Sequence, residues 1–356
     1  MFDGLIRRSK PGTAPGMLVG REPIPDEALT FTLTEYTLEG WEVYNEVEVA
    51  ECSFHLTTPG RTWIDVAGHA SAEMLRSLGQ AFHLHSLALE DVFHGNQRPK
   101  LEVYDKQGFI VLNDPVIVDD VFKSRQVSIF FGDNYVISFH DHKEDIFKPV
   151  RERIQQDGSR LRQFGTDYLV YALVDLVVDR KFPLLARLSE RLEELEDESM
   201  ESRPTRETAQ DIHAARRALV GFHRVQWAER ETVLALMRPD TPFIKPETRT
   251  YLRDCLDHAV TVQELVESYR DMASGLMELH LMETSNRMNE VMKALAIVTV
   301  FFMPLSFLAG IYGMNFETNV GNMPELGWKY GYVYFWAMVV LIVGGLFWWM
   351  RHRKWL

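Results

Sequence analysis

One face of an apolar segment near the C-terminal end carries side chains that could pass a metal ion. They recur three or four residues apart, which places them on one side of an α-helix. This stripe consists of Asn289, Met292, Leu295, Thr299, Met303, Ser306 and Gly310. In a pore, Asn289, Thr299 and Ser306 would form polar rings. The apolar side chains of Met292, Leu295 and Met303 would form constrictions that gate by dewetting. Packing between helices through small residues is the alternative explanation of the same pattern.

The tripeptide Gly313-Met314-Asn315 follows the stripe directly. Asn315 offers a neutral carbonyl oxygen that can accept hydrogen bonds from the water shell of an ion, and the flanking glycine permits close backbone approach. A neutral ligand suits conduction, because a conducted ion must be bound weakly enough to leave. Mg²⁺ in particular gives up its water reluctantly. Glu317 and Glu325 either add negative potential beside this mouth or are solvated loop residues.

Two uncharged runs are the elements that must position these residues. Residues 294–312 read ALAIVTVFFMPLSFLAGIY, and residues 330–350 read YGYVYFWAMVVLIVGGLFWWM. Each is about as long as the ~20 residues that a membrane-spanning helix needs. Tyr and Trp at both ends of the second run are typical of membrane interfaces. The sequence therefore predicts transmembrane helices over 294–312 and 330–350, joined by an external loop over 313–329. Two helices cannot enclose a pore, so a channel requires an oligomer.

Basic residues predict the orientation of the two spans. The loop between the spans holds a single lysine, Lys329. The basic residues on the other side are Arg287, Lys293, Arg351, Arg353 and Lys354. The positive-inside rule then puts both termini in the cytoplasm. The basic tail over 351–356 anchors this topology, and it could also restrict cation entry at the cytoplasmic mouth.

The remainder of the chain is predicted to be soluble and cytoplasmic. Residues 1–29 form a flexible tail, because residues 9–25 are rich in Pro and Gly. Alternating apolar and polar residues predict strands in an α/β domain over 30–165, including a hairpin that turns at residues 132–134. Helical periodicity predicts a stalk of long helices over 166–293, the last beginning near Glu247 and continuing to Tyr312. The acidic segment 188–202 is either a solvated helix face or a surface that concentrates cations.

Composition excludes several classes of function. The formal net charge of −13 over 356 residues argues against nucleic acid as the main partner. Two cysteines, Cys52 and Cys255, are too few and too far apart for a disulfide framework or a structural zinc site. We find no nucleotide-binding motif. A divalent ion gains about 4.6 kcal/mol on crossing 100 mV, so inward transport needs no enzymatic energy source.

Several segments together resemble the CorA family of magnesium channels. They are YGMNF, MPELGWKYGY, NEVMKALAIVTVFFMPLSFLAGIYGMNF, the ending KWL and, in the soluble part, HSLALEDVFHGNQRPKLEVY and YLRDCLDHAV. Gly-Met-Asn alone is weak evidence, but its place between two spans and before MPEL is highly specific. The residues TNVGN, 318–322, lengthen the loop relative to the family pattern. This insertion leaves the geometry of the outer mouth, and with it the ion preference, open.

The resemblance implies a homopentameric funnel in the plasma (inner) membrane that takes up Mg²⁺, with Co²⁺ or Ni²⁺ as substitutes and no organic cofactor. In the family pattern, the counterpart of Asn315 meets the hydrated ion at the pore entrance. The counterparts of Asp91 and Asp254 bind regulatory Mg²⁺ between neighbouring protomers. Further residues near that site in the family pattern are Glu90, Asp175 and His258.

Two other functions compete with a magnesium channel. The first is a zinc transporter of the same superfamily, with or without proton coupling. Zinc prefers nitrogen and sulfur ligands, whereas the stripe holds no His or Cys. The second is a membrane-anchored sensor or scaffold that conducts nothing, for which transport would not depend on the stripe.

Overall fold

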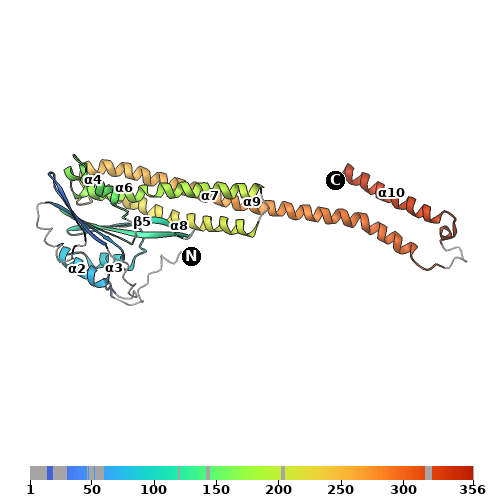
Figure 1. Ribbon diagram of the computed structural model, residues 1–356, viewed down its shortest axis with the longest axis horizontal. Coiled ribbons are helices and arrows are strands. Elements are labelled where there is room, and N and C mark those ends of the chain that lie inside the picture. The colour runs from blue at the N-terminus through green and yellow to red at the C-terminus, as the bar shows by residue number, and fades with distance from the viewer. Residues whose placement is uncertain are drawn as a thin grey trace. The chain divides into compact units, whose positions relative to one another are not determined.

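The computed structural model describes residues 14–18, 30–45, 47, 52, 60–118, 121–141, 145–201, 205–316 and 323–355. The chain divides into two compact units, residues 1–277 and 278–356. Most of the predicted tail over 1–29, Glu317 and the insertion 318–322 lie outside the described residues. Figure 1 shows the course of the chain by colour.

A seven-stranded sheet forms the centre of the first unit, in the order β2-β1-β3-β7-β6-β5-β4. Its strands are β1 (Thr30–Tyr36), β2 (Trp41–Asn45), β3 (Arg61–Ala67), β4 (Lys100–Tyr104), β5 (Gln107–Val118), β6 (Val121–Phe131) and β7 (Tyr135–His140). Strands β3 and β7 are parallel, with Ile64 opposite Ile137, and the other paired strands are antiparallel. The hairpin predicted at residues 132–134 is confirmed as the β6–β7 turn, where the Gly132 amide donates to the Tyr135 carbonyl.

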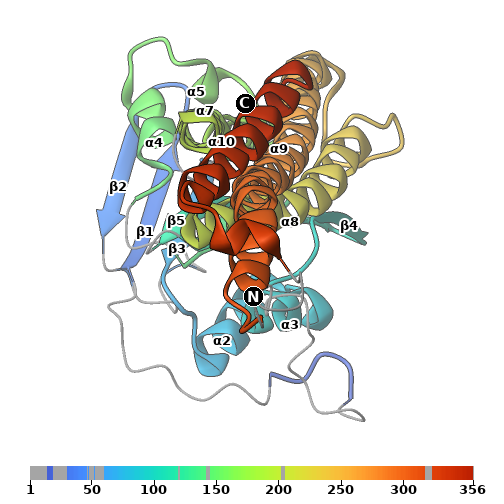
Figure 2. The same ribbon diagram turned by 90° about the vertical axis from the view of Figure 1, so that its right-hand side faces the viewer.

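Helices cover both faces of this sheet, so the alternate residues of each strand enter two different cores. Trp63 packs on one side with helices α4 (Lys148–Gln155), α6 (Thr166–Asp179) and α8 (Arg206–Leu236). The next residue, Ile64, packs on the other side with α2 (Ala72–Phe82) and α3 (Ser86–His94). Figures 1 and 2 show α2 and α3 on one face of the sheet and α4 on the opposite face. Burial on both faces explains why the central strands are apolar along their length.

Long helices extend the first unit beyond the sheet. Helix α5 (Arg160–Gln163) is short, whereas α7 (Lys181–Glu201), α8 and α9 (Pro246–Tyr312) form a helical layer. Leu192 of α7, Phe222 of α8 and Val262 of α9 meet in one apolar core. Residues 188–201 of the acidic segment lie in α7, where Arg191 forms ion pairs with Glu194 and Glu198 and with Asp211 of α8. Helix α9 begins at Pro246 and runs for 67 residues to Tyr312, as the sequence predicts.

The second unit contains two apolar helices that are long enough to cross a membrane. They are the C-terminal part of α9 and the helix α10 (Gly331–His352), which follows the short 3-10 helix η3 (Pro324–Gly327). Pro304 lies inside α9 without ending the helix. The rings of Tyr312 and Phe335 lie 5.2 Å apart and bring the two helices into contact. The protein is therefore a membrane protein with an α/β unit, a long helix and two C-terminal spans.

Candidate metal sites and ion path

A cluster of possible metal ligands joins helix α6 to helix α9. Asp175 and Asp179 lie one turn apart on α6, and His258 lies opposite them on α9. Ligand atoms of these three residues all fall within 4.8 Å of one another. The Nδ1 atom of His258 is 2.8 Å from Oδ1 of Asp179. Two carboxylates and one imidazole nitrogen form a donor set that suits a divalent cation.

The electrostatics of this cluster favour the arrival of a cation. The pKa of Asp175 is raised to about 6, mainly by burial and then by the negative charges of Asp179 and Asp254. His258 and Arg153 oppose this rise of the pKa. Among the described residues, the buried Oδ1 atom of Asp175 has no hydrogen-bond partner. A bound cation would stabilise the ionised carboxylate that burial and its neighbours disfavour.

The chain that follows Asp179 is fixed by two ion pairs. Lys181 forms an ion pair with Glu229 of α8, and both side chains are fully buried. Arg180 donates through Nε to Oδ2 of Asp114 at 3.0 Å. Because these residues directly follow Asp179 and anchor the start of α7 to β5 and α8, they fix where the last turn of α6 ends. We conclude that the packing of the first unit positions this cluster.

A second group of acids surrounds the end of helix α3. Asp91 forms an ion pair with Lys100 of β4, with a 2.7 Å separation between Oδ2 and Nζ. The neighbouring Glu90 is buried and accepts a hydrogen bond of 2.7 Å from the Gly16 amide. Burial raises the pKa of Asp91 in spite of the nearby lysine, and Glu102 and Glu90 add to the rise. Three carboxylates, those of Glu90, Asp91 and Glu102, thus lie near a single lysine in this group.

The structure places the five predicted regulatory residues in two groups. Asp175 and His258 share the α6–α9 cluster, and Asp254 is exposed one turn before His258 on α9. Glu90 and Asp91 belong to the α3 group instead. Sequence reasoning missed Asp179, although its spacing of four from Asp175 matches the spacing of Asp254 from His258. Two i, i+4 pairs of potential ligands on separate helices are the signal that could have revealed it.

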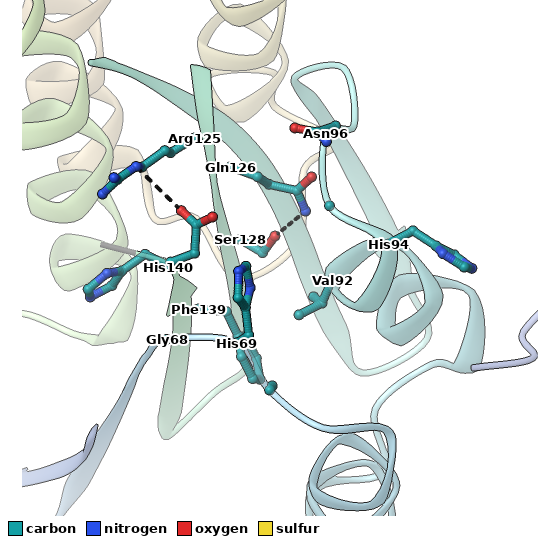
Figure 3. Close-up of a pocket in the computed structure, with 13 residues that line it drawn as sticks. Gly68, His69, Val92, His94, Asn96, Arg125, Gln126, Ser128, Phe139 and His140 are labelled. Atoms are coloured by element: carbon teal, nitrogen blue, oxygen red, sulfur yellow. Dashed lines mark hydrogen bonds and ion pairs between the residues drawn. The ribbon is translucent and has the colours of Figure 1, made fainter. Parts of the chain in front are cut away.

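A small polar cavity of about 80 Å³ opens where the parallel strands β3 and β7 end (Figure 3). Gln126 donates to the Ser128 hydroxyl at 2.8 Å, and Arg125 lies 3.9 Å from Asp141. His94 points away from this cavity in Figure 3. None of the sequence-predicted site residues lines the cavity. Its opposite charges face each other, so it has no excess of negative charge to attract a metal ion.

The stripe from Asn289 to Gly310 lies on an exposed face of α9, and all seven of its residues are exposed in the described chain. The opposite face holds the half-buried residues Ile297, Val300, Phe301, Pro304, Leu308 and Ile311. The Thr299 hydroxyl donates to the Leu295 carbonyl at 2.8 Å. The oxygen of that hydroxyl keeps lone pairs that can accept a hydrogen bond. The stripe therefore remains available for contacts outside this chain.

Helix α9 ends directly before the predicted mouth. The Gly313 amide donates to the Ala309 carbonyl at 2.9 Å, and the Met314 amide donates to the Ile311 carbonyl at 3.1 Å. A Cβ atom at Gly313 would lie 3.0 Å from the Ala309 oxygen, which is tight enough to favour glycine. Asn315 follows this turn and is exposed. Glu325 lies in η3 and accepts a 3.4 Å hydrogen bond from the Tyr312 hydroxyl.

These features define a class: a membrane protein with two C-terminal spans and acid-rich candidate cation sites in its α/β unit. A family model described as CorA-like Mg²⁺ transporter protein matches residues 60–352. The chain belongs to this family, whose members are transporters or channels and not enzymes.

Individual relatives agree with the family. The cobalt/magnesium transport protein CorA of Thermotoga maritima is 36% identical over 350 residues, which cover 98% of each chain. The solved structure of the CorA magnesium transporter from Methanocaldococcus jannaschii is similar in fold, with a TM-score of 0.78 at 22% identity, over 92% of this chain and 98% of that one. The zinc transport protein ZntB of Pectobacterium atrosepticum is more distant, at 24% identity over 65% of this chain and 68% of its own.

Proposed function

We propose that this protein is a homopentameric channel for Mg²⁺, with Co²⁺ and Ni²⁺ as further substrates. It lies in the plasma (inner) membrane with both termini in the cytoplasm, and the membrane potential drives ions inward. The observation that best supports conduction is the exposed stripe on α9, which leads directly to the exposed Asn315. The 36% identity to a cobalt/magnesium transport protein over almost the whole chain supports the choice of ions.

Five copies of the first span would line the pore. The described part of one chain offers two spans, and the stripe lies on the face opposite the half-buried residues of α9. Polar groups in a bilayer are best placed against other helices or water. An assembly with the stripe facing a common axis satisfies Asn289, Thr299 and Ser306 together. The residues 30–165 then form the cytoplasmic domain and 166–293 the stalk.

The pore would handle magnesium with its water shell largely in place. Asn315 offers an amide oxygen, and Thr299 offers a hydroxyl oxygen whose own proton is already donated to Leu295. Both oxygens can accept hydrogen bonds from water bound to the ion. Because neither carries a full charge, the ion is not held so tightly that it cannot leave. Glu317 and Glu325 would add negative potential around the mouth, and the basic tail 351–356 would face the cytoplasm.

Closure would follow from Mg²⁺ binding to the carboxylates of the soluble part. Asp254 is exposed, and Asp91 keeps part of its side chain exposed, so both can face a neighbouring protomer. Without Mg²⁺, facing carboxylates would repel one another. Mg²⁺ would bridge them and stabilise the closed arrangement only as far as it prefers that state. Glu90, Asp175 and His258, now joined by Asp179, would contribute to the same sensing region.

One observation favours the alternative of zinc transport. The α6–α9 cluster contains an imidazole nitrogen, and zinc binds nitrogen ligands well. That cluster lies in the first unit, however, whereas the stripe has no His or Cys. Magnesium therefore remains the better proposal for the transported ion.

Ion flux into proteoliposomes that contain the full-length protein tests this function. Wild-type vesicles should take up Mg²⁺ faster than Zn²⁺, and Asn315→Ala should reduce Mg²⁺ flux about tenfold or more while the pentamer stays intact. Asn286→Ala is the matched control, because Asn286 is also an exposed asparagine of α9 but precedes the predicted span over 294–312. Equal flux in both variants would refute the role of Asn315. Absence of flux for Mg²⁺, Co²⁺, Ni²⁺ and Zn²⁺ in the wild type would refute transport altogether.

A further inference from the structure

Lys100 lies between two carboxylates at the edge of the sheet. Its Nζ atom is 2.7 Å from Oδ2 of Asp91 and 2.7 Å from Oε1 of Glu102. Strand β4, which carries Lys100 and Glu102, is the last strand of the sheet order. All three side chains are partly exposed, with 18–36% of each accessible. One ammonium group thus bridges two acids where a neighbouring molecule or an ion can reach them.

The surrounding contacts fix both partners of this bridge. Gln126 donates through Nε2 to the Asp91 carbonyl at 3.0 Å, and its Oε1 accepts from the Gln97 amide at 2.8 Å. These two bonds tie the end of α3 to the segment that enters β4. The guanidinium of Arg98 stacks over the Trp227 ring of α8 at 5.0 Å, which anchors the same segment. These contacts hold the backbone on the two sides of the bridge close together, and the ion pair itself holds the Lys100 ammonium near Asp91.

The carboxylate of Glu102 gives Lys100 a second ion-pair partner. Glu102 also accepts a hydrogen bond of 2.7 Å from the Tyr104 hydroxyl, and this bond helps fix its position. If a divalent ion bound Asp91, Lys100 could stay with Glu102 and give up only one of its two partners. Displacement of the ammonium from Asp91 would still cost part of the binding free energy of the ion.

We infer that Lys100 is a tethered competitor that weakens Mg²⁺ binding at Asp91 and so sets the concentration at which the channel closes. This inference rests on the proposed sensing role of Asp91. The lysine lowers the negative charge of the site, and an arriving ion has to displace it from Asp91. Without such a competitor the carboxylates would bind Mg²⁺ at lower concentrations, and the channel would close at a lower cytoplasmic Mg²⁺ concentration. Lys100 is thus a residue that tunes affinity rather than a ligand of the ion.

The test measures how Mg²⁺ on the cytoplasmic side inhibits flux through the full-length protein in proteoliposomes. We expect Lys100→Met to lower the midpoint of inhibition about fivefold, which corresponds to about 1 kcal/mol. Lys100→Arg keeps the positive charge and should stay near the wild-type midpoint. Lys106→Met is the matched control, because Lys106 is an exposed lysine in the turn after β4. Its midpoint should equal that of the wild type.

Asp91→Asn separates failure of this inference from failure of the proposed function. If Asp91→Asn raises the midpoint but Lys100→Met leaves it unchanged or raises it, the competitor role is refuted while the sensor role stands. If Asp91→Asn itself leaves the midpoint unchanged, the sensor role of Asp91 is refuted. Lys100→Gln repeats the test if Lys100→Met does not fold, as judged by thermal unfolding without Mg²⁺. A shift for Lys106→Met equal to that for Lys100→Met would also refute the inference.

Discussion

The two units differ in their least favourably placed side chains, which are buried charged groups in the first unit and exposed apolar groups in the second. In the first unit, charged groups that enter the interior meet partners of the same chain: Lys181 pairs with Glu229, and Arg151 donates to Asp65 at 3.0 Å. In the second unit, large apolar side chains face outward, and Met303 and Phe307 are 65% and 69% exposed. In the first unit, burial of a charge without a partner would be costly. In the second unit, exposure of the apolar side chains to water would be costly.

This difference shows where each unit finds its missing contacts. The first unit satisfies most of its interior within one chain, and Asp175 stands out because its charge is poorly compensated there. The second unit cannot cover its apolar surface by itself, since the membrane-spanning window of α9 is 0% buried and that of α10 is 6% buried. Lipid covers apolar surface, whereas the polar stripe needs other helices or water. The first unit therefore finds most of its contacts within one chain, whereas the proposed conduction would depend on contacts that one chain does not supply.

The largest effect is expected where the first unit depends on an internal partner. Lys181→Met removes the only cation that Glu229 contacts among the described residues, and both side chains are fully buried. Removal of one member of a buried pair costs about 3–5 kcal/mol, because the other charge is left uncompensated. Thermal unfolding of the full-length protein in detergent should show a marked fall in Tm. Lys106 is exposed, so Lys106→Met should leave Tm unchanged. Equal Tm values for the two variants would contradict the account of this pair.

A smaller effect is expected at Asp175, whose charge lacks sufficient compensation. Its pKa of about 6 in the folded protein exceeds the usual carboxyl value of about 3.9, so the folded state binds this proton more tightly than the unfolded state. The contribution of Asp175 to stability is therefore lost as pH rises from about 4 through about 6. With a chelator present to remove metal ions, Asp175→Asn should raise Tm by a few degrees at pH 7.5, because it removes the destabilising ionised carboxylate.

The same variant should have little effect on Tm at pH 4, where Asp175 is already protonated. His258, Asp179, Asp254 and Arg153 all act on this carboxylate, so the comparison is made at both pH values for wild type and variant. Added Mg²⁺ should raise the Tm of the wild type at pH 7.5 more than that of Asp175→Asn. A variant that is less stable than the wild type at pH 7.5 without metal would contradict the raised pKa.

Local sequence patterns predicted the elements well but not the pairings between distant elements. The uncharged runs located α10 and the end of α9, because length and hydrophobicity are local properties. The run that starts at Glu247 has no proline and no pair of adjacent glycines before Pro304, and this predicted the long helix. The bond between His258 and Asp179 joins residues 79 positions apart, and periodicity within one helix carries no information about the other. The bridge from Lys100 to Asp91 likewise depends on how β4 packs beside α3.

The smallest effect is expected on the stripe, where it distinguishes a pore from ordinary helix packing. Thr299→Val keeps the shape of the side chain but removes the hydroxyl oxygen that could accept from a hydrated ion. The loss of one such hydrogen bond is worth about 0.5–1.5 kcal/mol, so Mg²⁺ flux in proteoliposomes should fall about threefold. Val298→Thr is the matched control, because Val298 is the adjacent residue and is 53% exposed on a different face of α9. If the stripe only packs helices, both variants should conduct like the wild type or lose assembly together. A selective loss in Thr299→Val would instead identify the exposed polar face of the second unit as the ion path.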